Sequence, residues 1–384
     1  MGAPRYTPNH RLIAMTSTRI FTLALVVCSL CNLHCRIFPE KQAPTPSDVQ
    51  RVFADVETSP VPASPTDDAA DDPAIWVHPT EPEKSLVIGT VKRYGLEVYD
   101  LKGVLRHTYR IGNPNNVDVR YGFKLGNGQT IDFAACSDRS NNQVALFRIE
   151  PATGALIETA RIQSNLTEVY GICLYRSSIS NLFYVFVNGK DGSLEQYELR
   201  PDGQTNITGH LKRTFRVETQ PEGLVADDQM GFVYLGEEDH AIWKLQAEPD
   251  KPTTLSMLAE SVPAKNRPIK YDIEGLAIFP TGDTTGYLIA SSQGNNTYAV
   301  FERSGNNRYL GSFAVGDNTM NGIDGTGETD GLDITARNLG APFEKGMLVV
   351  QDGFNLDAGG KSTSQNFKLI AWKNILPVIE SWKR

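Results

Sequence analysis

A strand-like segment recurs six times along this chain, and the recurrence constrains the fold more than any other feature of the sequence. The copies follow one another at intervals of roughly 45 to 70 residues, and most end in a turn signal. Internal repeats of this length are typical of propellers and solenoids. The copies are GLEVYDLKG (95–103), VALFRIEPATG (144–154), LEQYELRPDG (194–203), AIWKLQAEPD (241–250), YAVFERSGN (298–306) and FKLIAWKN (367–374).

Two further strand-like runs precede each copy. The run directly before it is short and apolar: SLVIGT (85–90), IDFAACS (131–137), LFYVFVNG (182–189), FVYLGEE (232–238), GYLIASSQG (286–294) and GMLVVQDG (346–353). A third run comes earlier still: DDPAIWVHP (71–79), NNVDVRYGF (115–123), TEVYGICLY (167–175), PEGLVAD (221–227), DIEGLAIF (272–279) and TDGLDIT (329–335). We expect a fourth strand from variable segments between the sets, such as RIGN (110–113), LKRTFRVE (211–218) and LGSFAV (310–315). The pattern predicts an all-β fold, a six-bladed β-propeller with four-stranded antiparallel blades around a central channel.

The composition agrees with this fold. The chain has 384 residues, of which 40% are hydrophobic and 21% charged, so it can bury a substantial core. Its 33 glycines and 22 prolines, without a long amphipathic helical pattern, favour short strands joined by turns. We assign the propeller to 67–384 and interpret the proline-rich stretch 44–66 as a linker or extended arm.

The start of the chain differs from the rest. Three arginines precede the apolar run IFTLALVVCSLC (20–31), which is too short to span a bilayer comfortably. This pattern predicts a signal peptide or N-terminal export segment over 1–43, and therefore a secreted or periplasmic protein. A buried N-terminal strand is the alternative. Lipid anchoring through Cys28, Cys31 or Cys35 is also open, although no clean lipobox is present.

The charge balance argues against a nucleic-acid partner. The formal net charge is −8, and because 1–43 holds five basic residues and one acidic residue, the remainder carries about −12. Cys136 and Cys173 are the two cysteines beyond the export segment, and they either pair as a disulfide or lie buried as small apolar groups. No Cys/His spacing typical of zinc sites occurs there.

Polar residues lead the first run of each set, and most of them are carboxylates. If that run is innermost, all six begin at one end of the channel and their side chains converge on the axis. Crowded carboxylates repel one another unless cations neutralise them, and oxygen donors without a Cys/His cluster favour Ca²⁺. The alternative is that each acid caps a strand end or turn on its own. The leading residues are Asp71, Asp72, Asn116, Asp118, Glu168, Tyr170, Glu222, Asp272, Glu274 and Asp330.

Basic residues follow the second run in three of the sets, at Lys92, Arg139 and Lys190. Each would lie beside the acidic ring on the same face. Cations next to a calcium cluster are favourable only where an anion bridges them, so the pattern predicts a phosphate-rich ligand. Taken singly, each residue is also explained as a solvated loop charge.

Ten motifs occur in the order found in one enzyme family. DDAADDPAIW, NNVDVRY, EVYG, EQYEL, EGLVADD, EEDHAIWK, DIEGL, SSQGN, DGTGETDG and QNFK resemble the β-propeller phytases, the alkaline, calcium-dependent class. The resemblance covers about 68–372. It implies a 3-phytase that needs several Ca²⁺ ions and hydrolyses phytate, myo-inositol hexakisphosphate, to lower inositol phosphates and phosphate. We expect a monomer that binds phytate as its calcium complex.

The resemblance also implies roles for individual residues. The family's central calcium ligands fall on Asp71 or Asp72, Tyr170, Glu222, Glu238, Asp272, Glu274, Gln293 and Asp330. Glu57 in VETSPV is a candidate for a further ligand of this central set, and the family's structural calcium sites map to Asp68, Asp324, Asp352 and Asn355. Its phosphate-binding residues map to Lys92, Arg139, Lys190 and Asn116. Catalysis would then depend on Glu222, Lys92, Arg139, Tyr170 and Lys190.

The implied mechanism has no covalent enzyme intermediate, because a calcium-activated water attacks phosphorus in line. RHTYR (106–110) is not the RHGxRxP motif of histidine phosphatases, and neither remaining cysteine opens a C-x5-R loop. Two other functions stay open. One is a calcium-dependent propeller lactonase or esterase, which would not need three cations at the channel mouth, and the other is a non-enzymatic secreted propeller that binds a partner.

Overall fold

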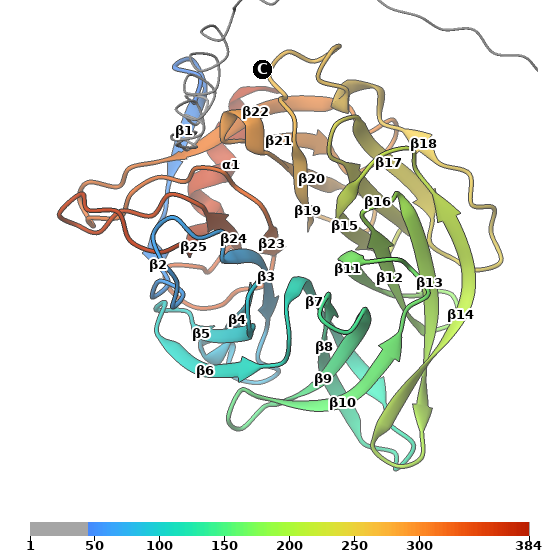
Figure 1. Ribbon diagram of the computed structural model, residues 1–384. Coiled ribbons are helices and arrows are strands. Elements are labelled where there is room, and N and C mark those ends of the chain that lie inside the picture. Colours follow the sequence, from blue (N-terminus) through green and yellow to red (C-terminus); the bar gives the residue numbers. More distant parts are fainter. Residues whose placement is uncertain (1–44, 384) are drawn as a thin grey trace, which may run out of the picture. The chain divides into compact units, whose positions relative to one another are not determined.

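Six β-sheets surround a central axis in the computed structural model, which describes residues 45–383 (Figure 1). The innermost strand of each sheet contacts the innermost strands of both neighbouring sheets, so the ring is closed. The prediction of a six-bladed β-propeller with the first run of each set innermost is confirmed. The innermost strands of blades 1 to 6 are β3 (Ala70–Trp76), β7 (Pro114–Lys124), β11 (Val169–Arg176), β15 (Pro221–Asp227), β19 (Ile273–Pro280) and β23 (Leu332–Thr335).

The other strands follow outward in chain order and pair antiparallel. The second strands are β4 (Leu86–Val91), β8 (Thr130–Asp138), β12 (Phe183–Gly189), β16 (Phe232–Glu237), β20 (Gly286–Ser292) and β24 (Met347–Asp352). The third strands are β5 (Gly95–Asp100), β9 (Gln143–Glu150), β13 (Ser193–Asp202), β17 (Ala241–Gln246), β21 (Thr297–Glu302) and β25 (Asn366–Ala371). The outer strands of blades 1 to 5 are β6 (Leu105–Arg110), β10 (Ala155–Gln163), β14 (Asn206–Arg216), β18 (Ser256–Met257) and β22 (Tyr309–Gly316).

The N-terminal part of the described chain completes two blades. β2 (Val56–Glu57) pairs antiparallel with β25 as the outer strand of blade 6, and β1 (Gln50–Phe53) lies parallel to β22 as a fifth strand of blade 5. The sequence predicts that the fourth strand of every blade comes from a segment between two sets of runs. For blade 6 this prediction is wrong, because β2, which precedes the first set, supplies the outer strand. The predicted export segment over 1–43 lies outside the described residues.

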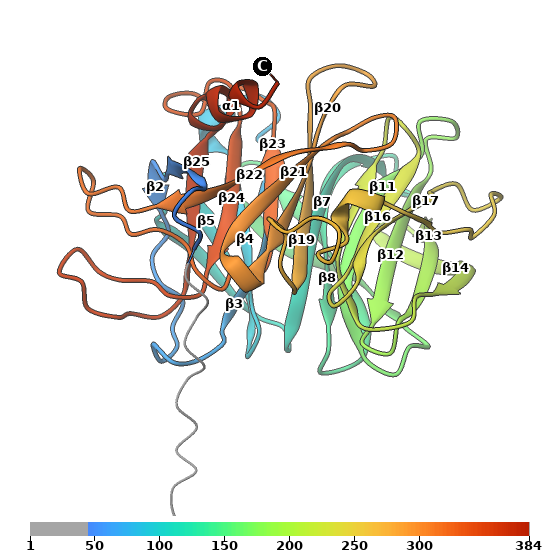
Figure 2. The ribbon, with the colours of Figure 1, turned by 90° about the horizontal axis from the view of Figure 1, so that it is seen from above.

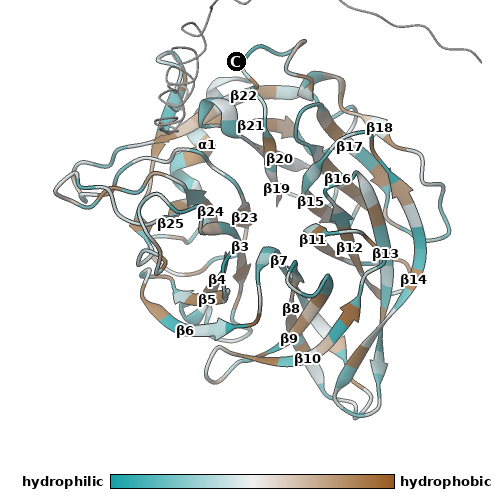
Figure 3. Cartoon of the chain, in the orientation of Figure 1, coloured by the Kyte–Doolittle hydropathy of each residue, from teal (hydrophilic) through white to brown (hydrophobic). Residues whose placement is uncertain are grey.

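Hydrophobic side chains form six buried clusters, and each cluster lies between two neighbouring blades. Between blades 2 and 3, for example, the rings of Phe123, Phe133 and Phe183 meet edge to face, with centroids 5.3 to 5.8 Å apart. Figure 3 shows hydrophobic stretches within the blades and hydrophilic loops at their ends. Since the core lies between blades, the channel mouth is free to carry polar groups.

The single described α-helix, α1 (Trp372–Ser381), contacts β1, β22 and β25 at one end of the blades (Figure 2). Trp372 stacks on Phe279 at 3.7 Å between ring centroids, so the helix extends the cluster between blades 5 and 6. Three 3₁₀ turns, η1 (Pro82–Lys84), η2 (Ala259–Ser261) and η3 (Gln293–Asn295), lie in connections. None of the helices within residues 45–383 is both long and apolar enough to cross a membrane.

Cys136 on β8 and Cys173 on β11 are both buried, and neither forms a disulfide within residues 45–383. Of the two alternatives that the sequence left open, the structure therefore shows small buried groups and no disulfide between them.

Candidate metal and phosphate site

A β-bulge interrupts five of the innermost strands where each passes the channel mouth. In β15, for example, the register with β16 shifts between Pro221 and Leu224, so Glu222 and Gly223 lie inside the bulge. A bulge redirects the side chain that it contains. The other bulges contain Asp71 and Asp72, Asn115 and Asn116, Tyr170 and Gly171, and Glu274 and Gly275.

Glycine follows the site residue in four blades because neighbouring inner strands approach closely there. A Cβ atom on Gly171 would lie 1.8 Å from the carbonyl oxygen of Glu222, and one on Gly223 would lie 2.2 Å from that of Glu274. Neither position can carry a side chain without moving the backbone of the next blade. The recurring acid–glycine pair in the sequence therefore brings carboxylates of adjacent blades together at the channel mouth.

Three glutamates form the first carboxylate group. One oxygen each from Glu222, Glu238 and Glu274 lie within 4.8 Å of one another. Burial raises the pKa of Glu238 to about 7 and, together with the charge of Glu222, raises the pKa of Glu274 well above its ordinary range. Oε2 of Glu274 is buried and has no hydrogen-bond partner in the part of the chain that the structure describes. The carboxylates of this group repel one another when they are ionised, and a divalent cation bound by their oxygens would neutralise that repulsion.

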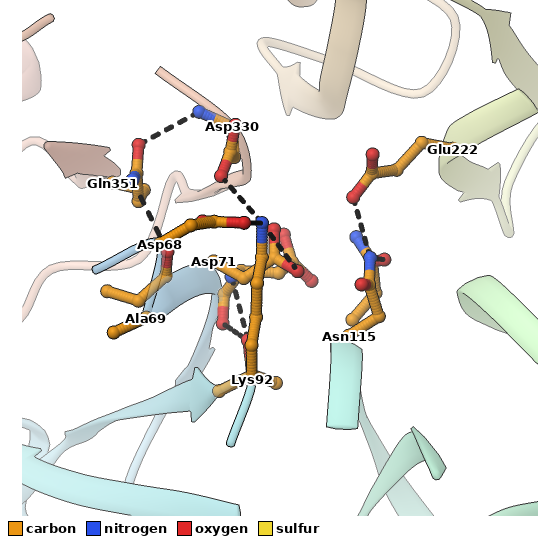
Figure 4. A network of polar contacts seen from close by, with 12 residues as sticks. Asp68, Ala69, Asp71, Lys92, Asn115, Glu222, Asp330 and Gln351 are labelled. Carbon is orange, nitrogen blue, oxygen red and sulfur yellow. Dashed lines mark hydrogen bonds and ion pairs between the residues drawn. The ribbon is translucent and has the colours of Figure 1, made fainter. Parts of the chain in front are cut away.

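Three aspartates surround Lys92 in the second carboxylate group (Figure 4). The Lys92 ammonium lies 2.9 Å from Asp68, 3.2 Å from Asp330 and 3.8 Å from Asp71. Burial lowers the pKa of Lys92, but the carboxylates of Asp330 and Asp71 outweigh it and raise that pKa well above its usual value. Both carboxylate oxygens of Asp71 are buried, and neither accepts a hydrogen bond from any of residues 45–383. Gln293 donates a hydrogen bond to the other oxygen of Asp330.

Lys190 and Tyr170 lie beside these groups. The Lys190 ammonium lies 4.6 Å from the centre of the Tyr170 ring and 3.6 Å from Glu168. Burial, followed by the charges of Glu222 and Asp71, raises the pKa of Tyr170. The predicted base Arg139 stands on the turn between β8 and β9, and its Nε is buried without a hydrogen-bond partner among the described residues.

Two amide side chains that sequence analysis did not single out contact the glutamates. Asn115 donates to Glu222 at 2.6 Å and to the Asn116 side chain at 2.8 Å (Figure 4). Gln220 donates to Glu238 at 2.7 Å. Asn115 directly precedes the predicted site residue Asn116, and this adjacency is the sequence feature that could have identified it. No sequence pattern identifies Gln220 as a site residue.

Two further predicted ligands belong to neither carboxylate group as defined above. Asp72 accepts a hydrogen bond from the backbone N–H of Val117 at 2.9 Å and lines a channel cavity of about 140 Å³. Burial, followed by the charges of Asp239 and Glu222, raises the pKa of Asp272, and the charge of Asp272 in turn contributes to the raised pKa of Glu238.

Three of the four predicted structural calcium ligands gather around a lysine that sequence analysis had not named. The fully buried ammonium of Lys368 donates hydrogen bonds to Asp324 and, at 2.5 Å, to Glu57, and it lies 3.4 Å from Asp352. It also donates to Asn355 at 3.0 Å. The fourth predicted ligand, Asp68, instead accepts a hydrogen bond from the ammonium of Lys92.

Glu57, which the resemblance makes a candidate for a further central ligand, lies instead in this second cluster beside Lys368. Burial raises the pKa of Asp352 to about 7, with Lys368 opposing the shift. Oδ2 of Asp352 has no hydrogen-bond partner within residues 45–383. The assignment of this cluster to structural calcium stays a prediction.

The fold and the site together define a β-propeller whose channel mouth carries carboxylates and lysines suited to hold cations and an anion side by side. The chain belongs to the phytase family, since the family described as Phytase matches residues 18–381. It is 46% identical over 331 residues to the 3-phytase of Bacillus subtilis (strain 168), covering 85% of this chain and 84% of that protein.

Solved structures show weaker similarity. A luciferin-regenerating enzyme has a TM-score of 0.49 and 9% identity, covering 79% of this chain and 91% of that chain. A functionally unknown protein from Desulfotomaculum acetoxidans DSM 771 has a TM-score of 0.41 and 19% identity, covering 63% and 71%.

Proposed function

We propose that this phytase hydrolyses phosphomonoesters of phytate with several calcium ions held at the channel mouth. The observation that carries the proposal is the juxtaposition of two oxygen-rich groups with lysines. The glutamate group and the aspartate group lie close enough for the charges of Glu222 and Asp330 to raise the pKa of both Asp71 and Glu274. A highly charged anion fits between such groups only together with cations.

The residues present fit calcium. Buried carboxylate oxygens of Asp71 and Glu274 lack hydrogen-bond partners, and hard oxygen donors are the ligands that calcium prefers. When bound, calcium neutralises phosphate charge and makes water a better nucleophile. The residues that would hold it are Asp71, Tyr170, Glu222, Glu238, Asp272, Glu274, Gln293 and Asp330.

Basic side chains of the protein would bind the phosphate groups of the substrate. Lys92 lies among the aspartates and Lys190 beside Tyr170, and their ammonium groups would bind phosphate oxygens and neutralise the charge that develops during hydrolysis. The unpartnered Nε of Arg139 offers a further donor. Because these bases stand on blades 1, 2 and 3, we infer that the substrate carries neighbouring phosphates. We also propose that the enzyme is an exported monomer.

Phosphate release from phytate tests the proposal. The protein is assayed with calcium, after exhaustive removal of calcium by a chelator, and after calcium is restored. We expect activity that is lost and then regained. Release that survives thorough calcium removal would contradict calcium dependence, and lactone hydrolysis without phosphate release would favour the propeller lactonases.

A further inference from the structure

In four of the five blades that have a bulge, the residue of the second strand that lies opposite the bulge is polar and fully buried. These residues are Thr90, Ser137, Asn188 and Ser291. Gln351 on β24 of blade 6, where β23 pairs without a register shift, is also polar and fully buried. In blade 4 the corresponding residue is Gly236. A bulge leaves backbone groups without a ladder partner, and burial of such groups is costly unless a side chain bonds them. The recurrence at one position indicates a shared role.

Ser137 and Asn188 each form hydrogen bonds with the backbones of two successive blades. Ser137 accepts a hydrogen bond from the backbone N–H of Asn116 in its own blade at 3.1 Å and donates one to the carbonyl of Tyr170 in the next blade. Asn188 accepts from the N–H of Gly171 at 2.7 Å and donates to the carbonyl of Glu222 at 2.9 Å.

The bridges form a continuous path through the site. Starting at Asn116, the path passes through Ser137 to the bulge of Tyr170, and from there through Asn188 to Glu222. Gln351 forms the same kind of bridge between the N–H of Asp330 and the carbonyl of Ala70, at 2.9 and 3.3 Å. Each bridge therefore fixes the distance between backbones that carry groups of the site in adjacent blades.

We propose that Ser137 and Asn188 are positioning residues, which set the spacing of Tyr170 and Glu222 and thereby the cation affinity of the channel mouth. They touch neither the substrate nor the cations; they act through the two backbones that they join. The inference rests on the proposed function, because it assumes that the channel mouth binds calcium. Outer-shell residues that orient metal ligands commonly contribute 10- to 100-fold to affinity or activity.

The chain offers a matched control for Ser137. Ser261 in η2 is also fully buried, accepts from the backbone N–H of Ile242 at 2.7 Å and donates to the carbonyl of Leu258 at 2.7 Å. Replacing either serine by alanine thus removes two hydrogen bonds to the backbone. The two hydrogen bonds of Ser261, however, lie within blade 4 and its connection to blade 5. Threonine is the conservative replacement for Ser137, because Thr90 occupies the corresponding position in blade 1.

The experiment compares Ser137→Ala, Ser261→Ala and Ser137→Thr in the full-length protein. Calcium affinity is measured by calorimetric titration of metal-free protein, thermal stability in chelator, and kcat and KM on phytate. We expect Ser137→Ala to weaken calcium binding by about 10- to 100-fold, Ser261→Ala to leave it unchanged, and Ser137→Thr to restore most of it.

Equal calcium affinities for folded Ser137→Ala and Ser261→Ala would overturn the inference. If Ser137→Ala does not fold, Ser137→Cys keeps the volume with a weaker donor, and an affinity equal to that of the original protein would overturn the inference in the same way. An original protein that neither binds calcium nor releases phosphate would instead contradict the proposed function.

Discussion

Glu222 has more influence on the site than any other acid that the sequence predicted. It belongs to the glutamate group, accepts a hydrogen bond from Asn115, and its charge raises the pKa of Asp71, Tyr170 and Glu274. Its backbone carbonyl is also bound by Asn188. The side chain therefore couples the two carboxylate groups electrostatically, while its own backbone is fixed by the neighbouring blade.

Replacing Glu222 by Gln keeps the shape of the side chain and removes one negative charge. We expect phytate turnover to fall by at least about 100-fold, because one cation-binding oxygen and its charge are lost. The melting temperature in chelator should rise, because repulsion among the remaining carboxylates decreases. Both quantities come from a steady-state phytate assay and a thermal scan. Turnover at the original rate would remove Glu222 from the catalytic site.

Lys92→Ala tests the cationic part of the site. We expect a loss of about 10- to 100-fold in kcat/KM for phytate, because a charge-assisted contact to phosphate is removed. In chelator the variant should also be less stable, since three carboxylates lose their counter-charge. Lys84→Ala is the control: Lys84 is an exposed lysine that pairs only with Glu81 among the described residues. Equal kinetics for the two variants would show that Lys92 does not bind phosphate.

Sequence reasoning found the acids but not the amides and the lysine between them. Glu222 and Asp330 could be predicted because each begins a repeated strand and is followed by glycine. Gln220 and Lys368 could not, since their partners Glu238 and Asp324 lie 18 and 44 residues away in the sequence, in segments that connect strands. Such contacts depend on how the connecting segments lie over the strand ends, and a single sequence does not display that information.

At the scale of strands, the pattern of apolar and polar residues was sufficient to predict the fold. It was insufficient to predict the geometry of the site, because many of the site residues lie in bulges. Apolar runs identified the strands of each blade, but a register shift of one residue changes where a side chain points without changing the pattern. β2 was missed for another reason. It has only two residues, and no period can be recognised in so short a run.

Removing β1 and β2 should destabilise blades 5 and 6. A variant beginning at residue 58 lacks the outer strand of blade 6, the fifth strand of blade 5 and Glu57, which pairs with Lys368. We expect its melting temperature to fall by at least ~5 °C, because a sheet edge is exposed and a buried ammonium loses one carboxylate. A variant beginning at residue 45 serves as control. Equal melting temperatures would mean that β1 and β2 do not stabilise the ring.

For the whole molecule, ring closure has an electrostatic consequence. The bulges of five blades and the start of β23 in the sixth meet at one channel mouth, so acids far apart in the sequence are buried together and their negative charges repel. Burial raises the pKa of Glu238 and of Asp330 to about 7, from ordinary values of 4.5 and 3.8. The folded protein therefore binds these protons more tightly than the unfolded chain does.

The stability of the metal-free protein should consequently fall as the pH rises. An acid whose pKa is raised on folding stabilises the fold fully below its unfolded value and loses that contribution as the pH rises through its folded value. For Glu238 and Asp330 this window runs from about pH 4 to about pH 7. Glu198 and Glu237, whose pKa values are lowered, lose their contribution only below about pH 4.5, so measurements above pH 5 isolate the raised groups.

Thermal scans in chelator between pH 5 and pH 8 measure this effect, and parallel scans with calcium provide the comparison. We expect the melting temperature in chelator to decrease with pH, and the added stabilisation by calcium to increase, because the cation competes with protons for the same oxygens. Glu222→Gln should flatten the decrease, since it removes one of the charges that raise the pKa of Glu238. A metal-free protein that becomes more stable from pH 5 to pH 8 would show that the carboxylates at the channel mouth are not crowded as the structure places them.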